Sequence, residues 1–173
     1  MGQLDLTFKR DIASLQFVVF DFDGVFTDNH VIITEGGLEG VRCWRGDGIG
    51  LRRLDAVGVE YLILSSETNL VVADRAKKLA IPFFQGCNDK SSVLSKTLLT
   101  KNIASENTAY VGNDINDLEC MKFVGVPVAV SDAYPEIVAV ARYVTDLPGG
   151  YGAVREVCDL VYKEKIESKA GAD

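Results

Sequence analysis

Four consecutive apolar residues, Phe17–Phe20, run directly into two carboxylates, Asp21 and Asp23, and then into Gly24. An apolar run this short is typical of a strand that is buried on both faces, as in a parallel sheet. The two acids would then lie at the carboxyl end of that strand, where open α/β sheets place their chemistry. Two neighbouring carboxylates repel each other and lose hydration there, so the pattern predicts a bound cation or two distinct roles in one reaction.

The rest of the chain alternates short apolar runs with segments of helical periodicity. This alternation predicts an α/β fold, a doubly wound parallel sheet in a single domain that spans residues 1–173. Two β-prone runs within about residues 29–44, joined by a glycine-containing turn, predict a β-hairpin insertion. The segments between the strands are too short for a cap domain. The polar tail, about residues 167–173, is expected to be flexible.

Composition excludes several classes of partner. The net charge of -7 and the lack of any Lys/Arg-rich run argue against nucleic acid. No apolar run approaches the roughly 20 residues that cross a bilayer, and no leader pattern precedes the first strand. The four cysteines are scattered without a CxxC pair, which is typical of reduced thiols. We therefore expect a cytoplasmic protein that does not bind membranes.

Polar side chains follow four of the predicted strands, and parallel strands bring such ends to one edge of the sheet. Carboxylates without histidine or cysteine favour Mg²⁺ over zinc. A hydroxyl, an ammonium and free backbone N–H groups at loop-to-helix turns suit a phosphate. The set therefore predicts metal-assisted phosphoryl transfer. Its members are Asp21, Asp23, Ser65, Lys90, Asp114 and Asp117.

Most members of this set also have a purely structural interpretation. Asp114 and Asp117 could cap a helix or stabilise its first turn, and Ser65 could be another N-cap. Lys90 could be an ordinary exposed lysine. No capping role explains two acids directly behind a buried strand, so we favour the functional interpretation of the whole set.

The motifs around these residues resemble those of the haloacid dehalogenase superfamily of aspartate-nucleophile phosphatases. Further segments resemble its capless branch, which contains KDO 8-phosphate phosphatase and the phosphatases of sialic-acid-type nine-carbon sugars. The similarity extends from about Phe17 to Tyr162. The segments that carry it are Asp21–Asp28, Leu64-Ser65, Gln85–Lys90, Ala109–Asp117 and Gly149–Glu156.

The resemblance implies a role for each acid. Asp21 would be the nucleophile that forms an aspartyl-phosphate, and Asp23 would protonate the leaving alkoxide and then deprotonate the hydrolytic water. Mg²⁺ would be held by Asp21, by the backbone carbonyl of Asp23 and by Asp114. Asp117 would support the metal shell or position Lys90.

The residues that the resemblance implies for binding phosphate and substrate depart in part from the pattern of the eight-carbon branch. Ser65 and Lys90 would hold the phosphoryl oxygens. The eight-carbon branch typically has Gly-Arg after the motif-two hydroxyl, whereas Ser66 and Glu67 follow it here. Its arginine directly precedes an Asp-Gly pair, whereas Arg45 stands one residue further away.

Glu67 and Lys78 resemble the nine-carbon branch, in which an acid and a lysine face each other near the site. A glutamate would repel the carboxylate of the substrate unless it is neutralised, so Lys78 is expected to pair with Glu67. This favours the 9-phosphate of KDN or N-acetylneuraminate as substrate. KDO 8-phosphate, and a non-catalytic module associated with an acylneuraminate cytidylyltransferase, remain as alternatives.

The hairpin carries more apolar β edge, from Val31 to Val41, than a monomer is expected to expose. A site without a cap domain must also exclude water by some other means. We therefore expect a homotetramer in which hairpins pair and a neighbouring subunit caps each site.

Overall fold

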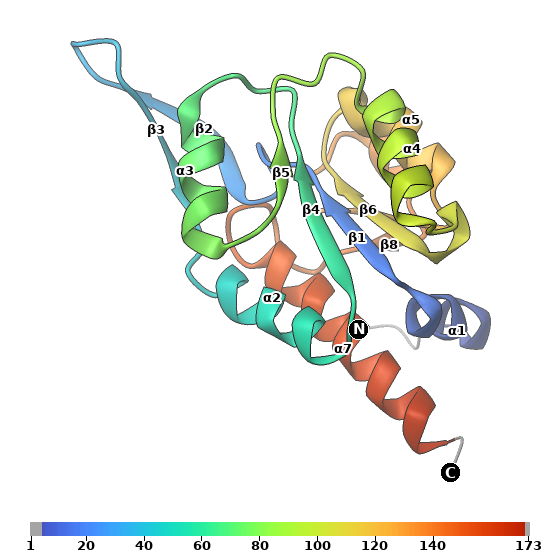
Figure 1. The fold of residues 1–173 in the computed structure, drawn as a ribbon. Helices are drawn as coiled ribbons and strands as arrows, with labels where there is room; N and C mark the ends of the chain where they lie inside the picture. The colour runs from blue at the N-terminus through green and yellow to red at the C-terminus, as the bar shows by residue number, and fades with distance from the viewer. Residues whose placement is uncertain (1–4, 172–173) are drawn as a thin grey trace.

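A six-stranded parallel sheet in the order β5-β4-β1-β6-β7-β8 forms the centre of the computed structural model, which describes residues 5–171 (Figure 1). Its strands are β1 (Phe17–Phe20), β4 (Glu60–Leu64), β5 (Phe83–Phe84), β6 (Thr108–Gly112), β7 (Val126–Ala129) and β8 (Tyr143–Val144). The chain winds outward from β1 in one direction and then in the other, which confirms the doubly wound fold expected from the sequence. The end of the expected flexible tail, residues 172–173, lies outside the described residues.

Within residues 5–171, seven α-helices connect or flank these strands. They are α1 (Leu6–Ser14), α2 (Asp47–Ala56), α3 (Leu70–Leu79), α4 (Lys90–Lys101), α5 (Leu118–Phe123), α6 (Pro135–Val138) and α7 (Ala153–Ala170). The last helix includes residues 167–170, which we expected to belong to the flexible tail. Lys169 lies in its last turn, where a positive charge interacts favourably with the helix dipole. No helix among residues 5–171 is long and apolar enough to cross a membrane.

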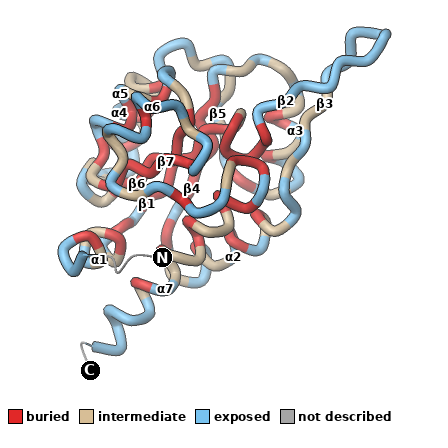
Figure 2. Tube along the Cα trace, turned by 180° about the vertical axis from the view of Figure 1, so that it is seen from behind, coloured by how far each residue is buried: buried red, intermediate tan, exposed pale blue. Residues whose placement is uncertain are grey.

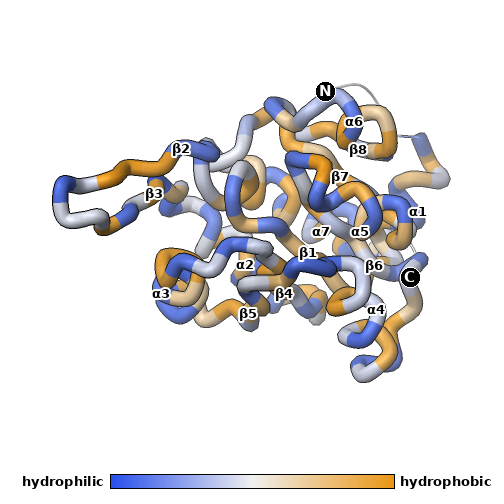
Figure 3. Tube along the Cα trace, turned by 90° about the horizontal axis from the view of Figure 1, so that it is seen from above, coloured by the Kyte–Doolittle hydropathy of each residue, from blue (hydrophilic) through white to orange (hydrophobic). Residues whose placement is uncertain are grey.

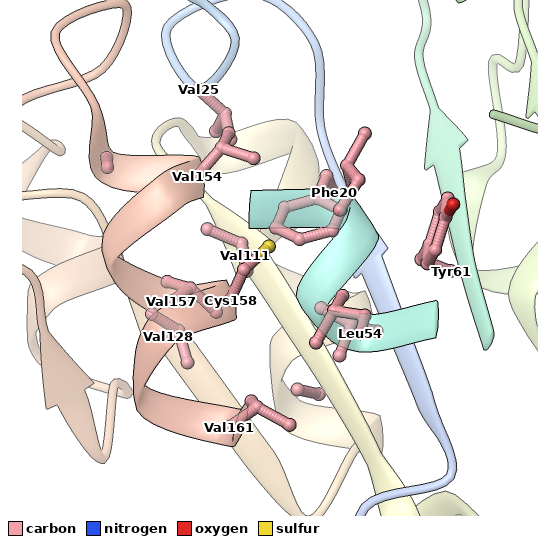
Figure 4. Close-up of a cluster of buried hydrophobic side chains, with 14 of the residues drawn as sticks. Phe20, Val25, Leu54, Tyr61, Val111, Val128, Val154, Val157, Cys158 and Val161 are labelled. Carbon is pink, nitrogen blue, oxygen red and sulfur yellow. The ribbon is translucent and has the colours of Figure 1, made fainter. Parts of the chain in front are cut away.

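Strand β1 is buried on both faces, and its alternate side chains serve two separate cores. Val18 and Phe20 join a cluster with α1, α2, α3 and α7. Phe17 and Val19 join a second cluster with α4, α5 and α6. Figure 4 shows part of the first cluster, where Phe20 lies among side chains of α2 and α7. Figure 2 shows that the strands of the central sheet are the most continuously buried part of the chain.

The predicted hairpin is formed by β2 (Thr27–Ile33) and β3 (Glu39–Cys43), which pair antiparallel and project away from the body (Figure 1). Its tip reverses at Gly37, whose φ of +74° favours glycine. The outer part of β2, Val31–Ile33, is hydrophobic (Figure 3), and Ile33 is 70% exposed. Among residues 5–171 no further domain covers the carboxyl edge of the sheet, as expected for a chain without a cap.

Candidate active site

Strand β1 delivers the two leading acids to the carboxyl edge, beside β6. The N–H of Asp21 donates to the carbonyl of Val111 at 2.9 Å, so the main chain stays attached to β6 for one residue beyond the strand. The turn then passes through Gly24, with φ of +76°. A Cβ on Gly24 would lie 1.9 Å from Nδ2 of Asn113, so only glycine allows the two loops to approach this closely.

Lys90 lies between two buried carboxylates. Its Nζ atom is 2.7 Å from Oδ1 of Asp21 and 2.8 Å from Oδ1 of Asp117. All three side chains are at most 5% exposed. The first residue of α4 thus reaches Asp21, the residue that the family resemblance implies to be the nucleophile. Lys90 is buried, so the alternative interpretation of this residue as an ordinary exposed lysine is wrong.

Asp117 is fully occupied by protein donors. Its Oδ1 accepts from Lys90 and from the hydroxyl of Tyr110 at 2.7 Å. Its Oδ2 accepts from the backbone N–H groups of Asn113 at 3.0 Å and Asp114 at 3.4 Å. A carboxylate with both oxygens engaged in this way is well placed to orient Lys90. Of the two roles expected for Asp117, this geometry supports the positioning of Lys90 over direct support of a metal.

A pocket opens at the same edge of the sheet. Carboxylates and amides dominate its lining, and these are the oxygen ligands that Mg²⁺ prefers. Oδ1 of Asn113 is buried there without a hydrogen-bond partner in the described chain. An orphaned oxygen beside carboxylates fits a hard cation. The pocket is lined by Asp21, Asp23, Asn29, Ser65, Ser66, Asn113, Asp114, Ile115 and Asn116.

Within residues 5–171 no group of three or more His, Cys, Asp or Glu side chains has a metal-binding arrangement. The expected ligand set has two carboxylates, those of Asp21 and Asp114, together with the backbone carbonyl of Asp23, and Asp117 was expected to support the metal shell or to position Lys90. Asp21 currently pairs with Lys90, and Oδ1 of Asp114 accepts from the N–H of Ile115. Mg²⁺ keeps several water ligands in protein sites, so this small set is sufficient.

The electrostatics of the site follow from burial. Burial and the negative charge of Asp117 raise the pKa of Asp21 to about 8, against the opposing effect of Lys90. Burial alone would lower the pKa of Lys90, but the charges of Asp21 and Asp117 outweigh it and raise that pKa. One ammonium shared by two buried carboxylates leaves an excess negative charge, which either a proton or a cation can balance.

Asp23 lies in a different environment from Asp21. Burial and the nearby charge of Glu67 raise its pKa, while Lys90 lowers it. Its Oδ1 accepts from the hydroxyl of Thr27 at 3.5 Å. A carboxyl whose pKa is raised retains its proton closer to neutral pH, as a general acid requires.

The two serines after β4 line the pocket as expected. Ser65 is buried, and its Oγ accepts from the N–H of Glu67 at 3.0 Å. Oγ of Ser66 accepts from Nδ2 of Asn116 at 3.2 Å, which links this loop to the one after β6. Neither hydroxyl donates a hydrogen bond within the described residues, so both can donate to a ligand.

The expected pairing of Glu67 with Lys78 is wrong within one chain. Oε1 of Glu67 accepts from the N–H groups of Thr68 and Asn69 at the start of α3. Lys78 lies in the last turn of α3, about 13 Å further along at 1.5 Å per residue. The helix thus separates the two side chains, and no ion pair between them occurs among residues 5–171. Arg45 is also exposed and does not line the pocket.

Three asparagines of the pocket were not predicted from the sequence. Asn113 and Asn116 lie within the segment after β6, so their place in a predicted site loop was a usable signal. Asn29 has a left-handed backbone with φ of +60° and comes from the hairpin. The sequence around Asn29 does not indicate that this side chain reaches the site, because tertiary packing decides the path of the hairpin.

Comparison with known families gives a direct match. The family model described as haloacid dehalogenase-like hydrolase matches residues 62–154. The 3-deoxy-D-manno-octulosonate 8-phosphate phosphatase KdsC of Yersinia pestis is 36% identical over 162 residues, covering 92% of this chain and 87% of that protein.

Solved structures agree with this match. A protein from Streptomyces avermitilis that is assigned to the HAD family of hydrolases is 44% identical, with a TM-score of 0.85 over 92% of this chain and 89% of that one. The 3-deoxy-D-manno-octulosonate 8-phosphate phosphatase of Moraxella catarrhalis, in complex with magnesium, phosphate and KDO, is 30% identical. Its TM-score is 0.89 over 96% of both chains.

Proposed function

For this chain, which belongs to the haloacid dehalogenase-like hydrolases, we propose the Mg²⁺-dependent hydrolysis of the phosphate monoester of a 2-keto-3-deoxy sugar acid. The family relationship makes the chain a phosphoric monoester hydrolase. The observation that carries the proposal is the buried contact of Lys90 with Asp21, because Asp21 also lines a pocket together with Asp23, Ser65 and Asp114.

The residues divide the reaction between them. Asp21 attacks phosphorus and forms the aspartyl-phosphate, while Asp23 donates a proton to the departing alkoxide. Asp23 then takes a proton from the water that releases phosphate. Ser65 and Lys90 hold the phosphoryl oxygens and balance the charge that spreads over them in the transition state. Asp21, Asp114 and the backbone carbonyl of Asp23 would hold Mg²⁺, which would supply neutralisation of negative charge in the site.

The substrate that we favour is a nine-carbon acid 9-phosphate of the KDN or N-acetylneuraminate type. Glu67 supports it, because this acid stands where the eight-carbon branch typically has arginine, and its charge contributes to the raised pKa of Asp23. KDO 8-phosphate is the second candidate, supported by the activity named for the relatives. Steady-state kcat/KM for the two compounds decides between them. A hundredfold preference for KDO 8-phosphate would contradict our choice.

A second measurement distinguishes an enzyme from a non-catalytic module associated with a cytidylyltransferase. Phosphate release from a panel of sugar phosphates, with and without Mg²⁺, is the direct test. Release that requires Mg²⁺ supports the proposal, and the absence of release from every compound would contradict it. A cytoplasmic location is part of the proposal, supported by four cysteines that are all free.

We further propose that the hairpin assembles the chain into a homotetramer and that a neighbour caps the site. Apolar side chains cover the outer part of the hairpin, and exposed edges of this kind favour pairing with another chain. The most exposed of them are Val31, Ile32, Ile33 and Leu38.

Charge on the hairpin is expected to dissociate the assembly without unfolding the subunit. Ile33→Asp places a carboxylate where the side chain is 70% exposed, so the isolated subunit loses little packing. Light scattering should report a smaller species, with the melting temperature of the subunit nearly unchanged. Leu99→Asp, at a position 82% exposed on α4, is the matched control and should leave the assembly intact. A wild-type protein that is already a monomer would exclude the tetramer.

Metal binding is expected to depend on pH. The pKa values of Asp21 and Asp47 are raised by burial to about 8 and about 7, above the ordinary 3.8. The folded metal-free protein therefore holds protons that the unfolded chain loses between about pH 4 and pH 8, so its stability falls as pH rises through this range. A cation replaces the proton at Asp21, so Mg²⁺ should stabilise the protein more at pH 8 than at pH 6.

Thermal unfolding with Mg²⁺ or with a chelator, at both pH values, measures this difference. Each kcal/mol of binding free energy should raise the melting temperature by about 2–4 °C. Calorimetry in two buffers of different ionisation enthalpy should also show proton release on Mg²⁺ binding. Heats that do not depend on the buffer would contradict the expected exchange of a proton for the metal.

A further inference from the structure

Tyr110 is a fully buried tyrosine that the mechanism above does not use. It lies on β6 directly beside Val19 of β1, two residues before Asp21. Side chains two residues apart along a strand share a face. Tyr110 therefore packs in the core below the site, on the side of the sheet that α4 and α5 cover.

A buried chain of contacts runs from this hydroxyl to the nucleophile. The Tyr110 hydroxyl donates to Oδ1 of Asp117 at 2.7 Å. The same oxygen is 2.8 Å from Nζ of Lys90, and Nζ is 2.7 Å from Oδ1 of Asp21. Asp117 is held from the other side by the N–H of Asn113. Each group is buried, so water cannot replace a lost partner without rearrangement.

The hydroxyl of Tyr110 affects how strongly Asp117 attracts Lys90. An oxygen that accepts from Tyr110 as well as from Lys90 shares its negative charge between two donors. Without the hydroxyl, Lys90 would be the single donor to Oδ1 of Asp117, while the N–H of Asn113 would still hold Oδ2, so the ammonium would be drawn toward Asp117 and away from Asp21. Burial and the charges of Asp117 and Asp21 raise the pKa of Tyr110 well above its usual value, so the hydroxyl keeps its proton.

We propose that Tyr110 is a positioning residue: through its hydrogen bond to Asp117 it orients Lys90 toward Asp21 and toward the phosphoryl group bound there. The proposal rests on the phosphatase function proposed above. Tyr110 does not touch the substrate, so its removal should change the rate of the chemical step and not the binding of the sugar.

The chain offers a matched control. Tyr61, on β4, is also a buried tyrosine, and its hydroxyl donates to Oδ1 of Asp55 at 2.9 Å. It faces the other side of the sheet, toward α2, away from Lys90. Tyr110→Phe and Tyr61→Phe therefore each remove one hydroxyl and one hydrogen bond to an aspartate, but only the first removes a contact of the site.

The experiment compares kcat and KM of the two variants with p-nitrophenyl phosphate and with the best sugar phosphate. We expect Tyr110→Phe to lower kcat about five- to tenfold for both substrates, as for the loss of one hydrogen bond, with KM unchanged. Tyr61→Phe should keep the wild-type kcat. An unchanged kcat in Tyr110→Phe, an equal loss in both variants, or a change confined to KM would overturn the proposal.

A second measurement does not depend on turnover. The ¹⁵Nζ resonance of the buried Lys90 ammonium, assigned by its loss in Lys90→Met, should shift or broaden in Tyr110→Phe and stay in place in Tyr61→Phe. An unchanged resonance in Tyr110→Phe would overturn the positioning role. If the wild-type protein releases no phosphate from any substrate, the proposed function fails, and this resonance still decides whether Tyr110 holds Lys90.

Discussion

Asp21→Asn is expected to reduce Mg²⁺-dependent phosphate release by at least about a thousandfold, or about 4 kcal/mol in the activation barrier. The amide keeps the shape of the side chain but cannot attack phosphorus or carry the charge that the metal requires. The measurement is kcat with the best substrate from the phosphatase panel. Activity within tenfold of the wild-type value would exclude Asp21 as the nucleophile.

The same substitution should not destabilise the metal-free protein. Asp21 and Asp117 compete for one ammonium, that of Lys90, and burial already raises the pKa of Asp21 to about 8. A neutral amide removes one of two buried negative charges, so the melting temperature in chelator at pH 8 should be equal or higher. Asp55→Asn is the control on the exposed side of α2 and should keep full activity. A large loss of stability in Asp21→Asn would show that the Lys90–Asp21 pair is needed for folding.

Lys90→Met is expected to affect both stability and catalysis. It leaves the carboxylates of Asp21 and Asp117 buried without their shared cation, and such a loss typically costs about 3–5 kcal/mol. The free energy of unfolding from urea titration measures this cost. It should be smaller at low pH, where Asp21 takes up a proton, and smaller with Mg²⁺, which supplies positive charge.

The catalytic loss in Lys90→Met should reach about a hundredfold in kcat, the usual effect of removing one group that stabilises developing negative charge. Lys96→Met, on an exposed position of the same helix α4, provides the matched control and should leave both kcat and stability near wild-type values. Equal stability of the two variants would show that Lys90 carries no charge needed in the folded state.

Local sequence predicted the acids, the serine and the lysine at the carboxyl edge of the sheet, but not the asparagines of the pocket. Asp21, Ser65, Lys90 and Asp114 each follow an apolar run that predicts a buried strand, and the loops after parallel strands must meet at one edge of the sheet. Their convergence needs only the period of the side chains and the direction of the strands. The sequence by itself therefore predicted the fold class and the phosphate chemistry.

Only the tertiary structure decided how these side chains contact one another. In the folded chain, Asp117 accepts hydrogen bonds from Lys90 and Tyr110. One oxygen of Asn113 has no partner among the described residues, and the length of α3 separates Glu67 from Lys78. Such outcomes depend on ångström distances between segments that are far apart in the chain, and these distances are set by packing of the two cores on the sheet. A periodic pattern determines which face a residue occupies, but not which atom across that face it contacts.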